Sequence, residues 1–195
     1  MRLRLIALVL LMLVCYALPW LINPGVSLSP GGYDLAEWSS LHYAVRAESP
    51  MLLTSFLLRL PLALIALLVG VSSPRKALSA IVIVLLAIAM LPPLEIIYTP
   101  SDPNYVQQAA VALIALVGGF VGWSGVLRRW QLPVLIGIGV VGAVAVVWGL
   151  VTASGLMRGF DLPVQTGFGG VALALLFGVS GFLLRNAKSA GTQSR

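Results

Sequence analysis

The stretch that decides the fold class is residues 132–152, which read LPVLIGIGVVGAVAVVWGLVT. The run contains no charged side chain, and a helix of this length crosses the roughly 30 Å hydrocarbon core of a bilayer at about 1.5 Å per residue. Lipid offers no partner to backbone N–H and C=O groups, so a spanning segment of this composition must be helical. The stretch therefore predicts a transmembrane helix.

The rest of the chain extends this pattern. Of 195 residues, 59% are hydrophobic and 9% are charged, whereas a soluble domain carries about a quarter charged residues. We predict an all-α, polytopic transmembrane bundle forming a single membrane domain over residues 1–195. Its apolar blocks indicate about six spans, at residues 3–22, 51–71, 77–94, 105–127, 132–152 and 166–184. No small-x-small cleavage site follows the first block, so we expect a retained helix rather than a cleaved signal peptide.

The longest connection, residues 23–50, contains a second pattern. Within residues 34–46, apolar side chains recur at three- and four-residue spacing: Leu35, Trp38, Leu41 and Val45. Asp34 and Glu37 give this segment a start that resembles a capping box. We predict a short amphipathic helix on the outer membrane interface, with Trp38 at headgroup depth.

The charges predict the orientation. With the N-terminus inside, nine of the twelve basic residues fall in inner segments and all six acidic residues fall outside. These nine are Arg2, Arg4, Arg75, Lys76, Arg128, Arg129, Arg185, Lys188 and Arg195. The positive-inside rule then puts both termini in the cytoplasm, predicts a multi-pass protein of the inner (plasma) membrane, and leaves residues 185–195 as a flexible cytoplasmic tail. It also explains the net charge of +6 without nucleic acid as a partner.

Small residues recur at four-residue spacing in the last three spans, where helices approach closely. The glycines we single out are Gly118, Gly122, Gly170 and Gly178. They pack these spans together within the chain, or one glycine face receives another membrane subunit. Both interpretations stay open at this stage.

Arg59 is the only charged residue inside a predicted span. A charge at that depth costs about 2.5 kcal/mol or more, so it is a candidate functional residue. The predicted spans hold no acid to neutralise it, which favours contact with a lipid headgroup, an anion or a partner protein; snorkelling to the outer interface is the alternative. His42 is the only histidine, so a bis-histidine haem site or a histidine metal cluster within the chain is excluded. We expect no cofactor and no metal, and read His42 and Trp38 as interfacial contacts.

Gly122-Trp123-Ser124-Gly125 resembles the Gly-x-Ser-Gly motif of rhomboid intramembrane proteases. The base that such a serine needs is missing, because neither the second nor the sixth span contains a histidine. We therefore expect no catalytic residue and no enzymatic activity. A transporter would need ionisable residues at the midplane or broken helices, and the spans offer Arg59 alone.

Two further segments carry a resemblance. Leu18-Pro19-Trp20 with Gly32-Tyr33-Asp34-Leu35, and Thr166-Gly167-Phe168-Gly169, resemble a broad set of uncharacterised bacterial multi-pass membrane proteins. In length and composition the chain also resembles accessory subunits of electron-transfer complexes such as alternative complex III. The resemblance implies a non-catalytic subunit that stabilises or assembles a larger bacterial membrane complex, with lipid and other membrane subunits as partners. A small transporter or channel and a membrane-bound enzyme are the alternatives.

Overall fold

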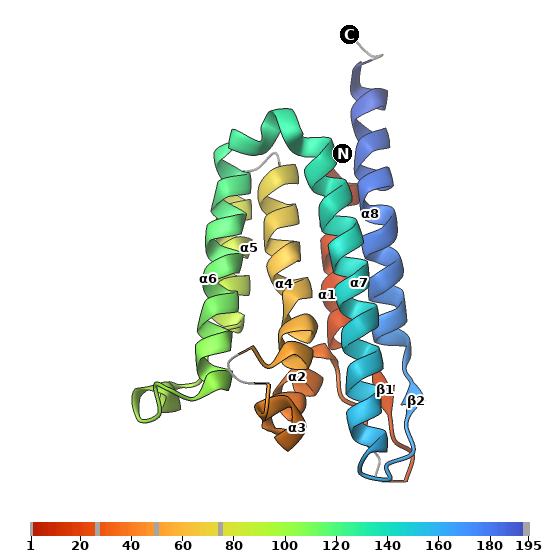
Figure 1. The fold of residues 1–195 in the computed structure, drawn as a ribbon. Coiled ribbons are helices and arrows are strands. Elements are labelled where there is room, and N and C mark those ends of the chain that lie inside the picture. The colour runs from red at the N-terminus through yellow and green to blue at the C-terminus, as the bar shows by residue number, and fades with distance from the viewer. Residues whose placement is uncertain (1, 26–27, 49–50, 74–75, 193–195) are drawn as a thin grey trace.

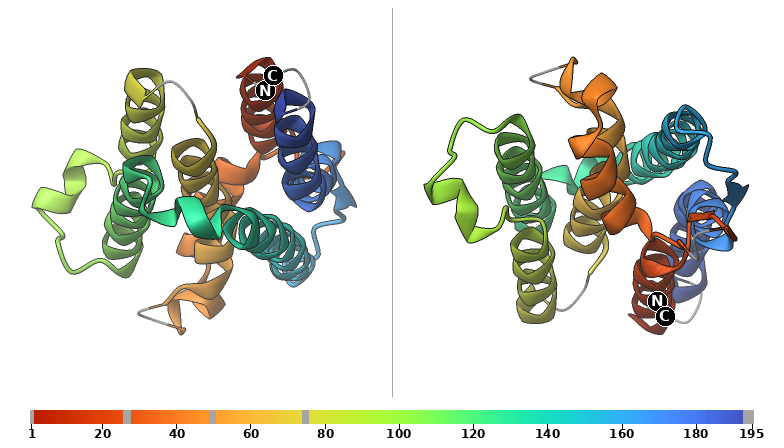
Figure 2. Two further views of the ribbon diagram at one scale, coloured as in Figure 1. Left: turned by 90° about the horizontal axis from the view of Figure 1, so that it is seen from above. Right: turned by 90° about the horizontal axis from the view of Figure 1, so that it is seen from below.

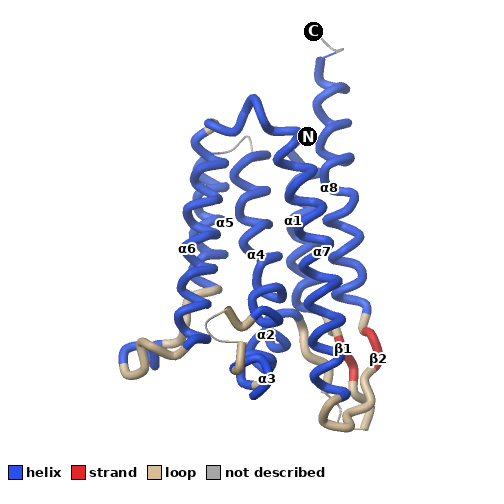
Figure 3. Tube along the Cα trace, in the orientation of Figure 1, coloured by secondary structure: helices blue, strands red, loops and turns tan. Residues whose placement is uncertain are grey.

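The computed structural model describes residues 2–25, 28–48, 51–73 and 76–192, and within them the chain is mostly helical (Figures 1 and 3). The α-helices are α1 (Arg2–Ala17), α2 (Gly32–Leu41), α3 (Tyr43–Arg46), α4 (Leu53–Ser72), α5 (Lys76–Ala89), α6 (Pro103–Ser124), α7 (Gln131–Arg158) and α8 (Phe168–Thr192). Two 3₁₀ helices, η1 (Leu94–Ile97) and η2 (Val126–Trp130), lie in connections. The two-residue strands β1 (Leu21–Ile22) and β2 (Gln165–Thr166) pair antiparallel, Leu21 with Thr166.

Helix α4 is the centre of the bundle. Seen along the helix axes, α5 and α6 lie on one side of it, and α7, α8 and α1 lie on the other (Figure 2). The inward face of α4 is made of large aliphatic side chains that are fully or almost fully buried: Leu58, Leu62, Ile65 and Leu68. The hydrophobic core therefore follows the length of α4.

Three helical segments are long and apolar enough to cross a membrane: Leu53–Ser72, Pro103–Ser124 and Val126–Arg158. Shorter apolar helices cover Leu3–Ala17, Lys76–Ala89 and Phe168–Ser180. The most apolar window of the first segment is 67% buried, whereas those of the other two are 39% buried. Fewer than half of the residues in those two windows are therefore buried inside the bundle.

The long helices alternate in direction (Figure 1). The start of α1, the end of α4, the start of α5, η2 and the end of α8 share one end of the bundle; α2, α3, η1 and the β1–β2 pair share the other. Lys76, Arg128 and Arg129 belong to the first end. Every acidic residue belongs to elements at the second end: Asp34, Glu37, Glu48, Glu95, Asp102 and Asp161.

Helix boundaries differ from the predicted spans where proline or hydroxyl side chains intervene. Helix α1 ends at Ala17, before Pro19, and α5 ends at Ala89, before Pro92-Pro93, because proline lacks an amide donor and restricts the residue before it. Helix α7 continues past the predicted end at Thr152, whose hydroxyl donates to the carbonyl of Trp148 at 3.0 Å. This polar group is satisfied inside the helix and does not end it.

Helix α8 also exceeds its prediction. It runs to Thr192 through residues 185–192, which the sequence predicted to be a flexible tail, and residues 193–195 lie outside the described residues. Four of the eight residues in this segment are strong helix formers: Arg185, Ala187, Lys188 and Ala190.

The predicted helix over 34–46 is in fact two helices. The backbone turns to an extended conformation at His42 (ψ 132°), which separates α2 from α3. The imidazole Nδ1 accepts a hydrogen bond from the amide of Ala44 at 3.1 Å and caps α3. Helix α2 packs against α4, and its Leu35 and Ala36 are completely buried. This segment is a covering element of the bundle rather than a free surface helix.

Candidate functional site

Arg59 lies on the inner face of α4, and its side chain is 1% exposed. Its Nη2 forms a salt bridge with Glu37 Oε1 at 2.7 Å. Its Nη1 donates to Ser55 Oγ at 2.6 Å and to Gln107 Oε1 at 2.9 Å. The charge therefore has an acidic partner within the chain, supplied by α2 in the connection between α1 and α4. A contact of the Arg59 guanidinium with lipid or another subunit would require these partners to be displaced.

Glu37 is the second centre of the cluster. Besides Arg59, its Oε1 accepts a hydrogen bond from Gln108 Nε2 at 2.7 Å, and its Oε2 accepts one from Asn104 Nδ2 at 3.3 Å. The Glu37 side chain is 34% exposed, so the cluster reaches solvent on the side of α2. One carboxylate thus joins α2, α4 and α6 at the acidic end of the bundle.

Gln107 forms the inner wall of this cluster. Its carbonyl oxygen faces Arg59, while its Nε2 donates to the carbonyl oxygens of Met51 and Leu52. Leu52 has a left-handed backbone (φ 44°) and is fully buried. A non-glycine residue in that region is strained, and Gln107 helps to hold it at the start of α4.

The cluster keeps unused hydrogen-bonding capacity. Among the described residues, Arg59 Nε, Asn104 Oδ1 and Gln108 Oε1 are buried without a hydrogen-bond partner. Buried polar groups nearly always find a partner in protein or water. The cluster is therefore polar enough to hold water or a small polar group between α2, α4 and α6.

The helical spacing of polar residues in the sequence is a signal for this cluster, although none of these residues is an acid within a predicted span. Ser55 and Arg59 are four residues apart, and Asn104, Gln107 and Gln108 follow an i, i+3, i+4 pattern. Each set therefore lies on one helix face. In an apolar chain, two helices that each have a polar face are expected to pack with these faces together. The contribution of Glu37 depends on how the connection between α1 and α4 folds against α4.

An exposed ion pair lies beside the cluster. Arg46 Nη2 contacts Asp102 Oδ2 at 2.9 Å, and Asp102 Oδ1 accepts from the amide of Asn104 at 2.8 Å, capping α6. Burial alone would raise the pKa of the Asp102 carboxyl. The hydrogen bonds from Arg46 and from the amides of Asn104 and Tyr105, with the positive charge of Arg46, outweigh it and lower that pKa. The pair ties α3 to the start of α6.

Trp38 and His42 belong to an aromatic group at the same end. The ring of Phe160, from the loop after α7, lies 4.8 Å from the His42 ring and 6.3 Å from the Trp38 ring between centroids. Tyr43 stacks on His42 at 4.7 Å. The His42 ring thus caps α3 and packs against rings of the same chain, and Trp38 is half-buried. Whether either residue contacts a partner or lipid stays a prediction.

The four candidate glycines divide into two pairs. A Cβ at Gly122 would meet the amide nitrogen of Val71 at 2.9 Å, and one at Gly170 would meet the Trp20 ring at 3.1 Å. These two glycines permit close packing within the chain. A Cβ at Gly118 or Gly178 would meet nothing within 4 Å, so these two leave open surface on α6 and α8.

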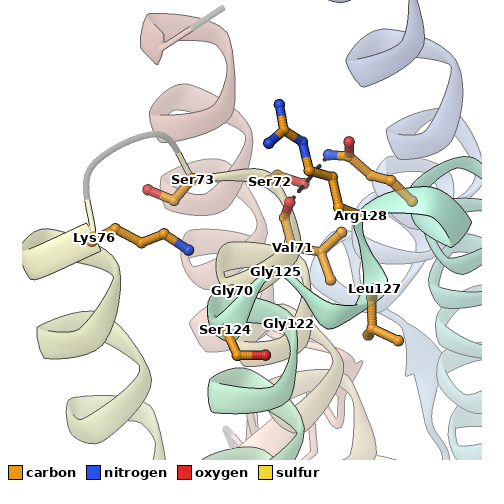
Figure 4. A pocket seen from close by; sticks show the side chains of 11 residues that line it. Gly70, Val71, Ser72, Ser73, Lys76, Gly122, Ser124, Gly125, Leu127 and Arg128 are labelled. Carbon is orange, nitrogen blue, oxygen red and sulfur yellow. Dashed lines mark hydrogen bonds between the residues drawn. The ribbon is translucent and has the colours of Figure 1, made fainter.

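A pocket of about 570 Å³ opens at the basic end of the bundle (Figure 4). The ends of α4 and α6, the start of α5, η2 and the start of α7 surround it. Gln131 Nε2 donates to the carbonyl of Val71 at 3.1 Å and closes one side. Ser124, the serine of the rhomboid-like motif, also lines this pocket, and its hydroxyl donates to the carbonyl of Val121 at 2.8 Å.

Within residues 2–25, 28–48, 51–73 and 76–192, no three side chains of histidine, cysteine, aspartate or glutamate come together as a metal site. Comparison of the chain with models of known protein families, with curated proteins and with solved structures gives no match. The class that the fold defines is therefore a helical bundle with apolar outer faces, and its function is argued from its own geometry.

Proposed function

We propose that the chain is a multi-pass protein of the bacterial inner membrane with six spans and both termini in the cytoplasm. Three segments are long and apolar enough to cross, and the shorter apolar helices run beside them. Helix α5, with 14 residues, is about 21 Å long at 1.5 Å per residue; local thinning of the bilayer and flanking residues accommodate such a mismatch. The gathering of basic residues at one end supports the orientation.

Within that membrane, we propose that the protein is a non-catalytic subunit that stabilises or assembles a larger complex. One observation carries this proposal: Gly118 on α6 and Gly178 on α8 face open space, where an added Cβ would meet nothing within 4 Å. The segment that contains α6 is also little buried, with 39% of its most apolar window inside the bundle. Small residues on a lipid-facing helix allow a partner helix to approach its backbone. An electron-transfer complex is the host we propose, and that choice rests on the resemblance in length and composition alone.

A second candidate function, a small transporter or channel, is favoured by the cluster around Arg59. Ionisable residues inside a membrane bundle mark ion and substrate paths. The cluster holds one ion pair and three unpartnered buried polar atoms among the described residues, and Glu37 is partly open to solvent. It lies at one end of the bundle, however, and a complete path would have to continue along α4 to the other end.

Gentle extraction from native membranes, followed by a native gel and mass spectrometry, tests the proposal. We expect the protein to migrate with a large assembly, and Gly118→Leu and Gly178→Leu to release it, because a leucine fills the gap that the partner helix needs. Gly118→Ala and Gly178→Ala are the matched controls, because alanine is small enough to allow close approach of a partner helix. Gly155→Leu, at an equally open glycine on α7, tests whether the partner approaches α7 as well. Migration of the wild-type chain alone would overturn the proposal. Substrate flux in liposomes that Arg59→Ala abolishes would establish the transporter instead.

A further inference from the structure

The pocket at the basic end of the bundle contains groups that the proposed function does not use. Its lining combines glycines and two apolar residues, Val71 and Leu127, with hydroxyl, amide and basic side chains (Figure 4). The lining residues used below are Ser72, Lys76 and Arg128. The pocket lies among the ends of α4 and α6, the start of α5, η2 and the start of α7.

Ser72 supplies the pocket lining with an unsatisfied hydroxyl. The residue is 7% exposed, and its hydroxyl has no hydrogen-bond partner among the described residues. Other serines on these helices bond to a carbonyl three residues earlier: Ser79 to Lys76 at 2.9 Å and Ser124 to Val121 at 2.8 Å. An enclosed hydroxyl without a partner costs free energy, and an acceptor atom from a bound ligand would remove that cost.

Two positive charges approach the pocket from opposite sides (Figure 4). The Lys76 ammonium donates to the backbone carbonyl of Trp123 and lies 5.0 Å from the centre of the Trp123 indole ring. Arg128 reaches in from η2, and its side chain is exposed. No carboxylate belongs to the lining, and all six acids lie at the other end of the bundle. The pocket is therefore positive and rich in donors.

We propose that this pocket binds a phosphate group, either the headgroup phosphate of an anionic phospholipid or a free phosphate compound. A phosphate supplies acceptor oxygens for the Ser72 hydroxyl and negative charge for Lys76 and Arg128, whose guanidinium pairs well with phosphate. In the proposed orientation the pocket opens at the cytoplasmic leaflet, where anionic headgroups gather. The inference rests on the membrane assignment but not on membership of a complex.

Native mass spectrometry of the purified full chain tests this inference, with phosphatidylglycerol, phosphatidylcholine or inorganic phosphate as the probe. We expect Ser72→Ala and Arg128→Gln to weaken retention of phosphatidylglycerol by about fivefold to tenfold, the effect of losing one charge-assisted hydrogen bond. Arg129→Gln is the matched control, because it removes the same charge from the neighbouring residue, which does not line the pocket.

The outcomes separate the two sources of phosphate. Retention of phosphatidylglycerol over phosphatidylcholine, lost in the two pocket variants, supports a lipid site. A rise in melting temperature with inorganic phosphate, lost in the same variants, supports a soluble phosphate compound. Equal loss in Arg128→Gln and Arg129→Gln, wild-type retention in Ser72→Ala, or no binding of either probe overturns the inference. Since the isolated chain is used, these results do not depend on assembly with a partner.

Discussion

At the scale of single residues, the ion pair between Arg59 and Glu37 is unequal. The Arg59 side chain is 1% exposed, whereas Glu37 is 34% exposed. Water can therefore take over part of the solvation of Glu37 if Arg59 is lost, but little water reaches Arg59 if Glu37 is lost. Removing the acid leaves an uncompensated buried charge, which is the more costly change.

We therefore expect Glu37→Gln to destabilise the fold by about 3 kcal/mol, and Arg59→Gln to destabilise it less. The double variant should lose less free energy of unfolding than the two single variants lose together, because the two residues interact directly. Thermal unfolding of the purified protein in detergent measures all three. Glu95→Gln is the control, since Glu95 is an exposed acid in η1. If the Glu37→Gln and Glu95→Gln variants have the same melting temperature, the Arg59–Glu37 ion pair does not stabilise the fold.

At the scale of elements, the contact between α4 and α6 depends on glycine. A Cβ at Gly70 would overlap the carbonyl oxygen of Gly119, and the opposing atom is backbone, which cannot rotate away. Gly118, the next residue on α6, faces open space. The two positions test close approach separately from helix propensity.

We expect Gly70→Ala to lower the melting temperature, with a loss of about 1–3 kcal/mol from overpacking. Gly118→Ala should leave it unchanged or raise it, because alanine favours helix by up to about 1 kcal/mol over glycine. Melting curves of the two variants in the same detergent provide the measurement. Equal losses in both would mean that the α4–α6 contact does not require glycine.

The apolar elements were predictable from the sequence because length and composition determine them directly. Their boundaries differ from the prediction at two positions. Helix α1 ends before Pro19, and α7 runs past Thr152, whose hydroxyl is hydrogen-bonded within the helix. The break at His42 was not predictable, since an imidazole that caps a four-residue helix leaves the apolar spacing of residues 34–46 intact. The sequence predicts Arg59 as a site residue because it is the only charge within a predicted span. It does not predict Glu37, because this residue contacts Arg59 only after α2 folds against α4.

At the scale of the whole molecule, the alternation of long helices gives the bundle a basic end and an acidic end. Retention of arginine and lysine on the cytoplasmic side then predicts which end faces the cytoplasm. Helix α5 is the shortest of the six helices that run along the bundle, so its crossing of the membrane decides the number of spans. A test of orientation must therefore place a probe on each side of α5.

Single-cysteine labelling provides such a test, in a Cys15→Ala background that removes the only native thiol. The probe sites are Ser73→Cys before α5, Tyr98→Cys after α5 and Trp130→Cys after α6; Tyr98 is 85% and Trp130 53% exposed. If the basic end faces the cytoplasm as proposed, a membrane-impermeant maleimide should label only Tyr98→Cys in intact cells and should reach the other two after permeabilisation. If Tyr98→Cys is protected as well, α5 does not cross the membrane, and the six-span arrangement is wrong. If Ser73→Cys and Trp130→Cys are labelled in its place, the orientation is inverted.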